Sequence, residues 1–324
     1  MESSMAQNDY SLKRKLLSWI IWSVAVVAVV ILLRGCVVTS CYIPSSGMEH
    51  SLLPGDLLLV SRWSYGLRMP FSGNQQEKRW GYDLGSRGDI ALFHHPAEPP
   101  ECPISSRPLY IGRLVGLPGD TLLVDSLFNV HQARLLSPDC QQLYAYPPVR
   151  EKQLDTLLRR LNLHHNRLLA ADTLRYIRSF SRYELYLLQQ ATSDTLSWLR
   201  PLDALAGESL LQPLVIPSKG SRIKVTPWNI TLLRNTLILH EHRRATIERG
   251  TLCVEGIPVS ACTFTQDYYW VCTNNPVNLC DSRLFGFVPH SHLTGRATHI
   301  WFSQQPGHGL FGGYRWNRIG LQVN

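Results

Sequence analysis

The sequence predicts a mostly β fold that is preceded by a hydrophobic helix and interrupted by one helical insertion. Three observations carry this prediction: an apolar run near the N-terminus, short apolar stretches that follow Gly-Asp turns, and a leucine pattern of helical spacing in the middle of the chain. The 324 residues are 44% hydrophobic, which is enough for one substantial domain or two small ones.

The apolar run covers residues 16–33 and contains no charged residue. Its 18 residues just reach the length that a helix needs to cross a hydrocarbon core of about 30 Å. Three positive charges at residues 13–15 precede it and Arg34 follows it, which predicts a cytoplasmic N-terminus (residues 1–15) and an exported remainder. A cleaved signal peptide is disfavoured because no A-x-A-like site follows, and a lipoprotein signal ending at Cys36 is disfavoured by Arg34. We therefore expect a membrane anchor.

Residues 36–128 and 216–305 are predicted to form the β core. Asp56, Asp89 and Asp120 each stand in a Gly-Asp turn that is followed by an apolar run, a common entry signal for a strand. We interpret these three carboxylates as turn residues and not as catalytic groups.

Strands are predicted again after the insertion, beginning with residues 222–233. Residues 250–264 form a hairpin candidate with Glu255 and Gly256 at its turn. The tail, residues 306–324, is rich in glycine and aromatic residues and gives no functional signal.

The middle of the chain, residues 129–215, is predicted to be an inserted, α-rich cap subdomain. Its pattern is a row of leucines at helical spacing with arginines on the opposite face: Leu154, Leu157, Leu158 and Leu161. Such a row usually faces a core, and a helix that binds a partner is the alternative.

Charge and cysteine content limit the functional classes. The net charge of +8 suits an anionic membrane surface, whereas the scattered basic residues show no nucleic-acid recognition motif. Eight cysteines in an exported domain allow disulfides, with Cys253–Cys262 and Cys272–Cys280 as local candidates, or buried free thiols. No C-x-x-C unit or ligand cluster indicates a metal or a cofactor.

Five motifs occur in a defined order behind the predicted anchor. They are "IPSSGM…LLPGDLLLV" (43–60), "YGLRMP" (65–70), "RGDIALF" (87–93), "YIGRLVGLPGD" (110–120) and "DSRLFGFVP…GRATHIW" (281–301). In this order they resemble the type I signal peptidases, membrane-anchored serine endopeptidases that remove signal peptides from exported proteins. The resemblance implies a core of coiled β-sheets with a smaller inserted α/β cap, metal-free chemistry and a place in the bacterial inner (plasma) membrane.

The family reaction needs a serine that attacks the scissile carbonyl and a desolvated lysine that accepts its proton. The serine of the family pattern stands directly before a methionine, and the lysine stands before "RxVGLPGD". Here these positions hold Gly47 and Gly112. Glycine can neither attack nor accept a proton, so the Ser/Lys dyad is absent from its family positions.

A third family motif is altered in the same direction. Thr273 stands where the family has a glycine, and Leu279 stands where a serine supports the lysine. The support residues Asn275, Asp281, Ser282 and Arg283 are retained.

Ser46 is the remaining candidate nucleophile, one residue out of register, and Ser45 matches the family serine that helps line the oxyanion hole. A base for Ser46 is not evident. Arg113 does not deprotonate, Lys78 lies in no motif, and the histidines His50, His94 and His95 are ordinarily surface or strand-end residues.

The sequence therefore predicts a signal peptidase family protein that is catalytically impaired. We expect it to bind signal peptides of exported proteins, or to pair with an active signal peptidase or the secretion machinery, beside membrane lipid. An active signal peptidase that uses Ser46 with an unidentified base is the first alternative, and an inherited scaffold without binding activity is the second.

Overall fold

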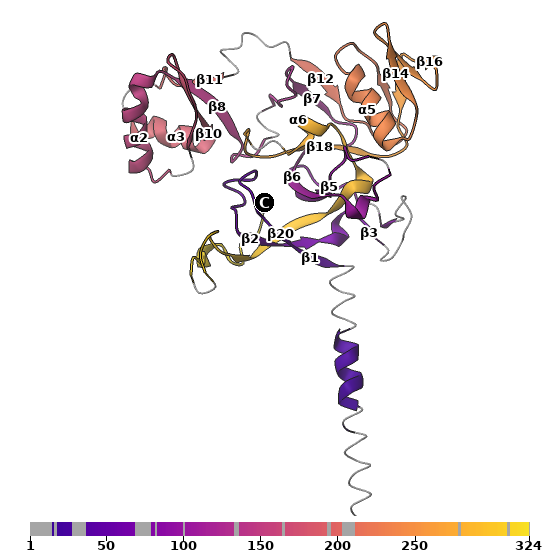
Figure 1. Cartoon of the computed structure of the whole chain (residues 1–324), viewed down its shortest axis with the longest axis horizontal. Helices are drawn as coiled ribbons and strands as arrows, with labels where there is room; N and C mark the ends of the chain where they lie inside the picture. The colour runs from indigo at the N-terminus through magenta and orange to yellow at the C-terminus, as the bar shows by residue number, and fades with distance from the viewer. Residues whose placement is uncertain are drawn as a thin grey trace, which may run out of the picture.

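The fold is mostly β, as the sequence predicts, with several antiparallel sheets and few helices. A computed structural model describes residues 15, 18–27, 37–68, 79–81, 83–99, 101–132, 136–163, 166–192, 196–202, 211–277, 280–309 and 312–323. Figure 1 shows the main sheet in the centre, one lobe above it at each side, and helical residues 18–27 below β1.

The main sheet has seven strands in the order β1-β2-β20-β5-β6-β18-β19. Their bounds are β1 Val38–Tyr42, β2 Asp56–Ser61, β5 Ile90–His94, β6 Leu109–Gly116, β18 Tyr268–Cys272, β19 Val288–Pro289 and β20 Leu293–Ser303. Every residue of β5 and β18 is buried, so these strands are covered on both faces. The edge strand β1 alternates between exposed and half-buried residues, and it leads directly into the loop that carries the family's nucleophile position.

The three Gly-Asp turns share one geometry, which confirms the interpretation of their aspartates. In each turn the carboxylate accepts a backbone N–H from the residue three positions earlier, at 2.8 Å for Asp56, 2.9 Å for Asp89 and 2.8 Å for Asp120. The preceding glycines have φ values of 93°, 94° and 87°, a conformation that side chains rarely adopt. The repeated "GD" is thus a local structural device at the entry to β2, β5 and β7 (Thr121–Val124).

One lobe contains small sheets and the helix α5 (Ile230–His240). Its strands are β7 Thr121–Val124, β12 Gln212–Val215, β13 Arg222–Lys224, β14 Ala245–Glu248, β15 Thr251–Val254, β16 Ile257–Pro258 and β17 Ala261–Thr263, paired as β7-β12, β13-β17 and β14-β15-β16. The predicted hairpin is confirmed: Val254 pairs with Ile257 around Glu255 (φ 52°) and Gly256 (φ 78°).

The strand predicted over residues 222–233 is wrong beyond Lys224, because α5 begins within it at Ile230. Ile230, Leu233 and Leu237 are buried at a spacing that follows the turn of a helix. The short apolar stretch therefore belongs to one helix face, which packs against the lobe's core.

The other lobe is the inserted subdomain. It contains a four-stranded sheet in the order β11-β8-β10-β9 and two helices. The bounds are β8 Gln141–Tyr146, α2 Glu151–Arg160, β9 Leu168–Ala171, β10 Tyr176–Ser181, α3 Arg182–Ala191 and β11 Arg200–Pro201. The predicted leucine helix is confirmed as α2, whose Leu154 and Leu158 are buried against Phe180 and Leu188.

The sheet of the insertion agrees with the α/β cap that the family resemblance implies, whereas the residue pattern alone predicts a helix-rich segment. At its two ends, the stretch 129–215 also contributes to the neighbouring lobe, where Val130 bridges to Val124 and β12 pairs with β7. The residues with a sheet and core of their own run from Gln141 to Pro201.

Short elements connect these sheets. They are β3 Leu67–Arg68, β4 Arg79–Trp80, α6 Ser282–Phe285 and the 3-10 helices η1 Arg62–Tyr65, η2 Ile104–Ser106, η3 Pro148–Arg150, η4 His290–His292 and η5 Trp316–Arg318.

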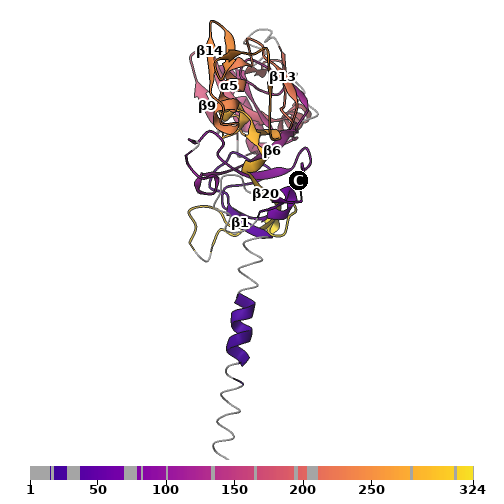
Figure 2. The ribbon, with the colours of Figure 1, turned by 90° about the vertical axis from the view of Figure 1, so that its right-hand side faces the viewer.

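The predicted anchor, residues 16–33, lies only partly within the described residues. Residues 18–27 are helical and exposed, and residues 16–17 and 28–33 fall outside. No helix among the described residues is both long enough and apolar enough to span a bilayer. Figure 2 shows the helical residues 18–27 closer to β1 than to the other labelled elements.

The C-terminal tail is fastened to the turn before β2. Asp56 is fully buried, and its carboxylate accepts a hydrogen bond from Arg318 Nη2 at 2.7 Å and one from Ser303 Oγ at 2.6 Å. Arg315 Nη1 lies 3.5 Å from the same carboxylate, and Arg318 Nη2 also donates to the Ser51 carbonyl oxygen. The tail therefore supports the loop that precedes β2.

Candidate functional site

The candidate site is built around the loop between β1 and β2. We call residues 45–51 the site loop. It is anchored by Ile43, Met48 and Leu52, which are each at most 2% exposed in one apolar cluster. Within it, Ser45 is exposed, Ser46 is half-buried and Gly47 is buried. The anchors fix the loop's backbone, so that Ser45 and Ser46 lie at the surface between buried apolar neighbours.

The stretch that follows β18 contacts the site loop directly. We call residues 273–277 the late loop. The Asn275 backbone N–H donates to the Gly47 carbonyl oxygen at 3.0 Å, and its side-chain amide donates to the Ser46 carbonyl oxygen at 3.4 Å. The Asn274 side chain donates to the Glu49 carbonyl oxygen at 3.2 Å. The structure thus brings the predicted residues Ser45, Ser46, Gly47 and Asn275 together.

The family's base position, Gly112, lies in the central strand β6 opposite Ala91 of β5. A Cβ added at Gly112 would lie 2.5 Å from Val271 Cγ1 and 3.3 Å from the Cys272 carbonyl oxygen. Real Cβ contacts below 3.0 Å are essentially absent from proteins, so the space for the root of a lysine side chain is occupied. A lysine at this position would therefore require Val271 to move.

Beside this position, the Arg113 guanidinium reaches the site loop. Its Nη2 donates to Ser51 Oγ at 3.2 Å and its Nη1 to the Gly88 carbonyl oxygen at 2.7 Å. Burial lowers the pKa of Arg113, an effect that Asp139 opposes, yet a guanidinium does not act as a proton acceptor in proteins. Arg113 is therefore a structural cation here.

Ser51 is the centre of this polar group, and sequence reasoning missed it. Its hydroxyl donates to Asp139 Oδ2 at 2.7 Å and accepts from Arg113 and from the Asn274 amide at 2.9 Å. A hydroxyl has one proton and two lone pairs, so Ser51 has no lone pair left for attack. No local pattern could have revealed this, because Asp139 and Asn274 are 88 and 223 residues away in sequence.

The candidate histidine bases are engaged elsewhere. His50 has a left-handed backbone (φ 70°), and its Nε2 lies 3.0 Å from the Gln141 amide nitrogen and 3.5 Å from Glu184 Oε1, both in the inserted subdomain. His94 Nδ1 lies 3.0 Å from the Arg107 carbonyl oxygen. His95 packs between Tyr110 and Phe285, and burial lowers its pKa.

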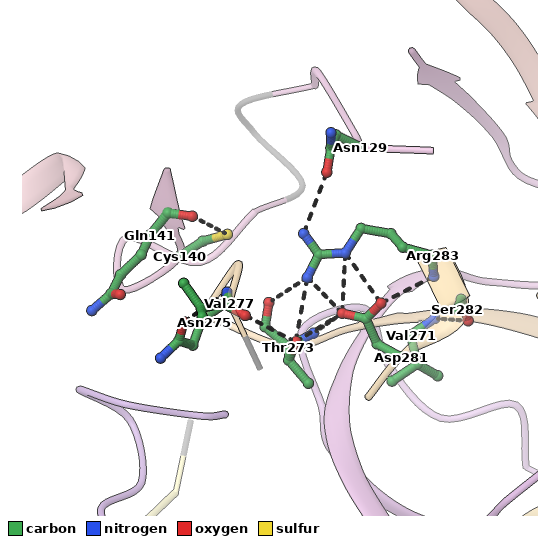
Figure 3. A network of polar contacts seen from close by, with 10 residues as sticks. All are labelled: Asn129, Cys140, Gln141, Val271, Thr273, Asn275, Val277, Asp281, Ser282 and Arg283. Atoms are coloured by element: carbon green, nitrogen blue, oxygen red, sulfur yellow. Dashed lines mark hydrogen bonds and ion pairs between the residues drawn. The ribbon is translucent and has the colours of Figure 1, made fainter. Parts of the chain in front are cut away.

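The retained support residues form a closed network at the start of α6 (Figure 3). Asp281 is fully buried, and its carboxylate accepts from Arg283 Nη2 at 2.6 Å and from the Thr273 hydroxyl at 2.8 Å. Burial alone would lower the pKa of Arg283, but the hydrogen bonds and charge of Asp281 raise it overall. Ser282 Oγ accepts the Val271 backbone N–H at 2.9 Å. Thr273, at the family's glycine position, therefore donates its hydroxyl to the Asp281–Arg283 ion pair and does not contact a reacting group.

Three described cysteines in or near the late loop are poor candidates for a replacement nucleophile. Burial raises the pKa of Cys272 far above its ordinary value, and burial also raises the pKa of Cys140 and of Cys280. Their thiols are protonated at neutral pH and are weak nucleophiles. The seven cysteines in the described part of the chain form no disulfide, and Cys36 and Leu279 lie outside the described residues. Among the residues placed by the structure, no group of His, Cys, Asp or Glu side chains has the geometry of a metal site.

Comparison with known proteins identifies similar sequences. Residues 16–134 match the family described as signal peptidase, peptidase S26. The signal peptidase I of Buchnera aphidicola from Schizaphis graminum is 25% identical over 279 residues, which cover 85% of this chain and 71% of the relative. These similarities support membership of the signal peptidase family.

Two further signal peptidases illustrate the distribution of similarity. The signal peptidase I of Buchnera aphidicola from Baizongia pistaciae is 25% identical over 299 residues, covering 91% of this chain and 80% of the relative. That of Pseudomonas aeruginosa is 36% identical over 99 residues, covering 30% of this chain and 31% of the relative. The long matches at low identity extend over the insertion and the second half of the chain.

Proposed function

We propose that this signal peptidase family member is catalytically impaired and acts by binding extended peptides at the site loop. Its partners in this proposal are the signal peptides of exported proteins, or an active signal peptidase whose substrate it presents. The observation that carries the proposal is Gly112: the base position lacks a side chain, and Val271 fills the space where one would begin.

Peptide binding is supported by the position of β1 at the edge of the main sheet. An edge strand presents unpaired backbone N–H and C=O groups, to which an extended segment can add as a further strand. β1 ends at Tyr42, three residues before Ser45, so a peptide along this edge would reach the site loop. A chain without a dyad can still hold a peptide in this way.

Placement at the bacterial plasma membrane is part of the proposal, with a cytoplasmic N-terminus and an extracytoplasmic main domain. Exposed aromatic residues near β1 and β20 support it: Trp63, Trp301 and Trp316 are 63%, 47% and 75% exposed. Indole rings favour the interface between lipid and water. Trp301 lies in β20, and the 3-10 helices η1 and η5, which carry Trp63 and Trp316, contact β20. Figure 1 shows β1 and β20 on the side of the main sheet that faces helical residues 18–27, which are also apolar and exposed.

The test uses the full-length chain in detergent and a signal-peptide substrate with alanine at the small-residue positions. We expect no cleavage, and we expect binding of the labelled peptide measured by fluorescence anisotropy. Tyr42→Pro, which alters the end of β1, should weaken binding, whereas the exposed tail substitution Gly309→Ala should not. Equal binding by both variants would place the peptide elsewhere, and no binding by the unmodified chain would contradict the proposal.

The alternative is an active peptidase with Ser46 as nucleophile. Ser46 is half-buried in the site loop beside Gly47, which gives it surface access. Cleavage that is retained by the unmodified chain and abolished by Ser46→Ala would establish this alternative. Cleavage that survives Ser46→Ala would indicate a contaminating enzyme.

A further inference from the structure

The inserted subdomain presents an edge strand that the proposed function does not use. β9 is the last strand of the sheet β11-β8-β10-β9 and pairs only with β10 among the described strands. All four of its residues are exposed, with Leu168 and Leu169 at 40% and 39%. Leu174, at the tip of the β9–β10 hairpin, is 80% exposed. The hairpin therefore presents apolar side chains beside an open sheet edge.

The backbone of β9 has groups directed to that open edge. The Asp172 N–H donates to the Arg175 carbonyl oxygen at 3.0 Å, which makes these two residues a hydrogen-bonded pair. In an antiparallel ladder hydrogen-bonded pairs alternate with pairs whose N–H and C=O groups point outward. The next pair, Ala171 with Tyr176, is of the second kind. The N–H and C=O groups of Ala171 thus face away from β10, where another strand can pair with them.

Positive charge flanks this edge at both ends. Arg167 directly precedes β9, and Arg175 lies across from its far end. Both are exposed, and the guanidinium group of neither forms an ion pair or hydrogen bond with any residue that the structure places. The neighbouring Asp172 carboxylate accepts the Thr173 N–H at 2.6 Å within its own turn, and among the described residues it forms no ion pair with either arginine.

The rest of the subdomain surface has the same sign of charge. In its described part seven cationic residues are exposed: Lys152, Arg159, Arg160, Arg167, Arg175, Arg182 and Arg200. Fewer carboxylates reach the surface there: Asp172 is exposed, and Asp155, whose side chain is 41% exposed, pairs with Arg159 at 3.0 Å. A positive field of this kind attracts acidic partners and repels basic ones.

We propose that β9 binds an extended, acidic segment of another protein by strand addition. The segment carries apolar residues that contact Leu168 or Leu169, between carboxylates that pair with Arg167 and Arg175. Four residues of strand extend about 14 Å, so the two carboxylates are separated by three or four residues. Main-chain hydrogen bonds provide affinity and the flanking ion pairs provide direction and selectivity.

A second copy of this chain is a poorer occupant of the edge. Antiparallel pairing of β9 with its own copy would bring Arg167 of one chain toward Arg175 of the other, and like charges in close contact are destabilising. A membrane surface is also disfavoured, because Figure 2 shows β9 in the upper part of the molecule, away from helical residues 18–27.

The experiment measures anisotropy of a labelled peptide, acetyl-Glu-Val-Ile-Val-Glu-amide, with the full-length chain in detergent. The double variant Arg167→Glu/Arg175→Glu should weaken binding by about tenfold or more. The matched control is Lys152→Glu/Arg160→Glu on α2, which changes the net charge equally and should weaken binding by less than about threefold. A peptide with lysine in place of both glutamates should not bind the unmodified chain.

A backbone variant tests strand addition separately from charge. Ala171→Pro removes the outward N–H and should weaken binding by about tenfold, while Ala171→Thr keeps it and should bind like the unmodified chain. Circular dichroism and thermal melting establish whether each variant is folded. If the Ala171→Pro variant does not fold, the charge variants alone decide whether the proposal stands.

Three results would overturn the proposal. The first is no binding of the peptide, at millimolar concentration, to the folded, unmodified chain. The second is equal affinity of the Arg167→Glu/Arg175→Glu variant and its control for the peptide. The third is binding of the chain to anionic lipid vesicles without binding to the peptide. Sedimentation that reveals a dimer, which Ala171→Pro dissociates, would assign the edge to a second copy of this chain.

Discussion

Gly112→Ala is expected to destabilise the protein, although alanine is ordinarily the better strand residue of the two. The added Cβ would lie 2.5 Å from Val271 Cγ1, whereas an ordinary contact lies at 3.4 Å or more. Overpacking of this kind costs about 1–3 kcal/mol, and loss of the glycine's unfolded-state freedom offsets about 0.5–1 kcal/mol. The expected net loss of unfolding free energy is about 1–2 kcal/mol.

Urea denaturation of the full-length chain measures this, with Gly309→Ala as the control. Gly309 has open space around its Cβ position and should change stability by less than about 0.5 kcal/mol. A double-mutant cycle with Val271→Ala should reveal a coupling of about 0.5–3 kcal/mol, because the smaller side chain removes the clash. A Gly112→Ala variant that is more stable than the unmodified chain, or a cycle without coupling, would refute the steric reasoning.

The same geometry governs any attempt to restore the family dyad. Gly47→Ser with Gly112→Lys places both functional groups at their family positions, but the lysine must displace Val271 to enter β6. We therefore expect peptidase activity only when Val271→Ala or Val271→Gly accompanies the two changes. Peptidase activity of the Gly47→Ser/Gly112→Lys variant without a change at Val271 would mean that the Val271 side chain moves aside at little energetic cost, and it would contradict this prediction.

Three further predictions concern stability. Asp281→Asn should cost about 3–5 kcal/mol in urea denaturation, because it leaves the largely buried Arg283 without its charge partner; a loss below about 1 kcal/mol would contradict this. Burial, aided by Arg107, lowers the pKa of His240 to about 3, so the unfolded chain binds a proton between about pH 6.5 and pH 3 that the folded chain does not. The free energy of unfolding therefore decreases as the pH is lowered through this window, and His240 accounts for about 2 kcal/mol of the loss at pH 5. His240→Gln should remove that part of the difference between the urea midpoints at pH 7.5 and pH 5. Arg318→Ala should lower the free energy of unfolding by about 2–3 kcal/mol, since it removes a donor to the buried Asp56 and to the Ser51 carbonyl oxygen. It should also increase amide hydrogen exchange at residues 51–56. Unchanged exchange there would contradict the claim that the tail supports the site loop.

Features that depend on neighbours in sequence were predictable. The three Gly-Asp turns are closed by contacts that span three residues, so their motif is sufficient to specify them. The leucine helix α2 and the Glu255–Gly256 hairpin also follow from local spacing. In α5 the same local signal was misread, because a short apolar stretch fits a strand and one face of a helix equally well.

Features that depend on distant segments were not predictable. The motifs identified Gly47, Gly112 and Asn275 as members of one site, but not what surrounds them. The occupation of the Gly112 side-chain space by Val271 is a property of strand pairing between β6 and β18. The engagement of His50 by Gln141 and Glu184 likewise requires the inserted subdomain to be in place.

The long separations around Ser51 have a consequence for the order of folding. Its hydroxyl is held by Asp139 and Asn274, which are 88 and 223 residues away, and closing such large loops delays a contact until other structure has formed. The strands β1 and β2 are close in sequence and can pair early, whereas the loop between them acquires its final conformation only after the inserted subdomain and β18 have folded. A refolding chain should therefore gain its β-sheet signal first, and a fluorophore attached at Ser45 should report the site loop in the slowest phase.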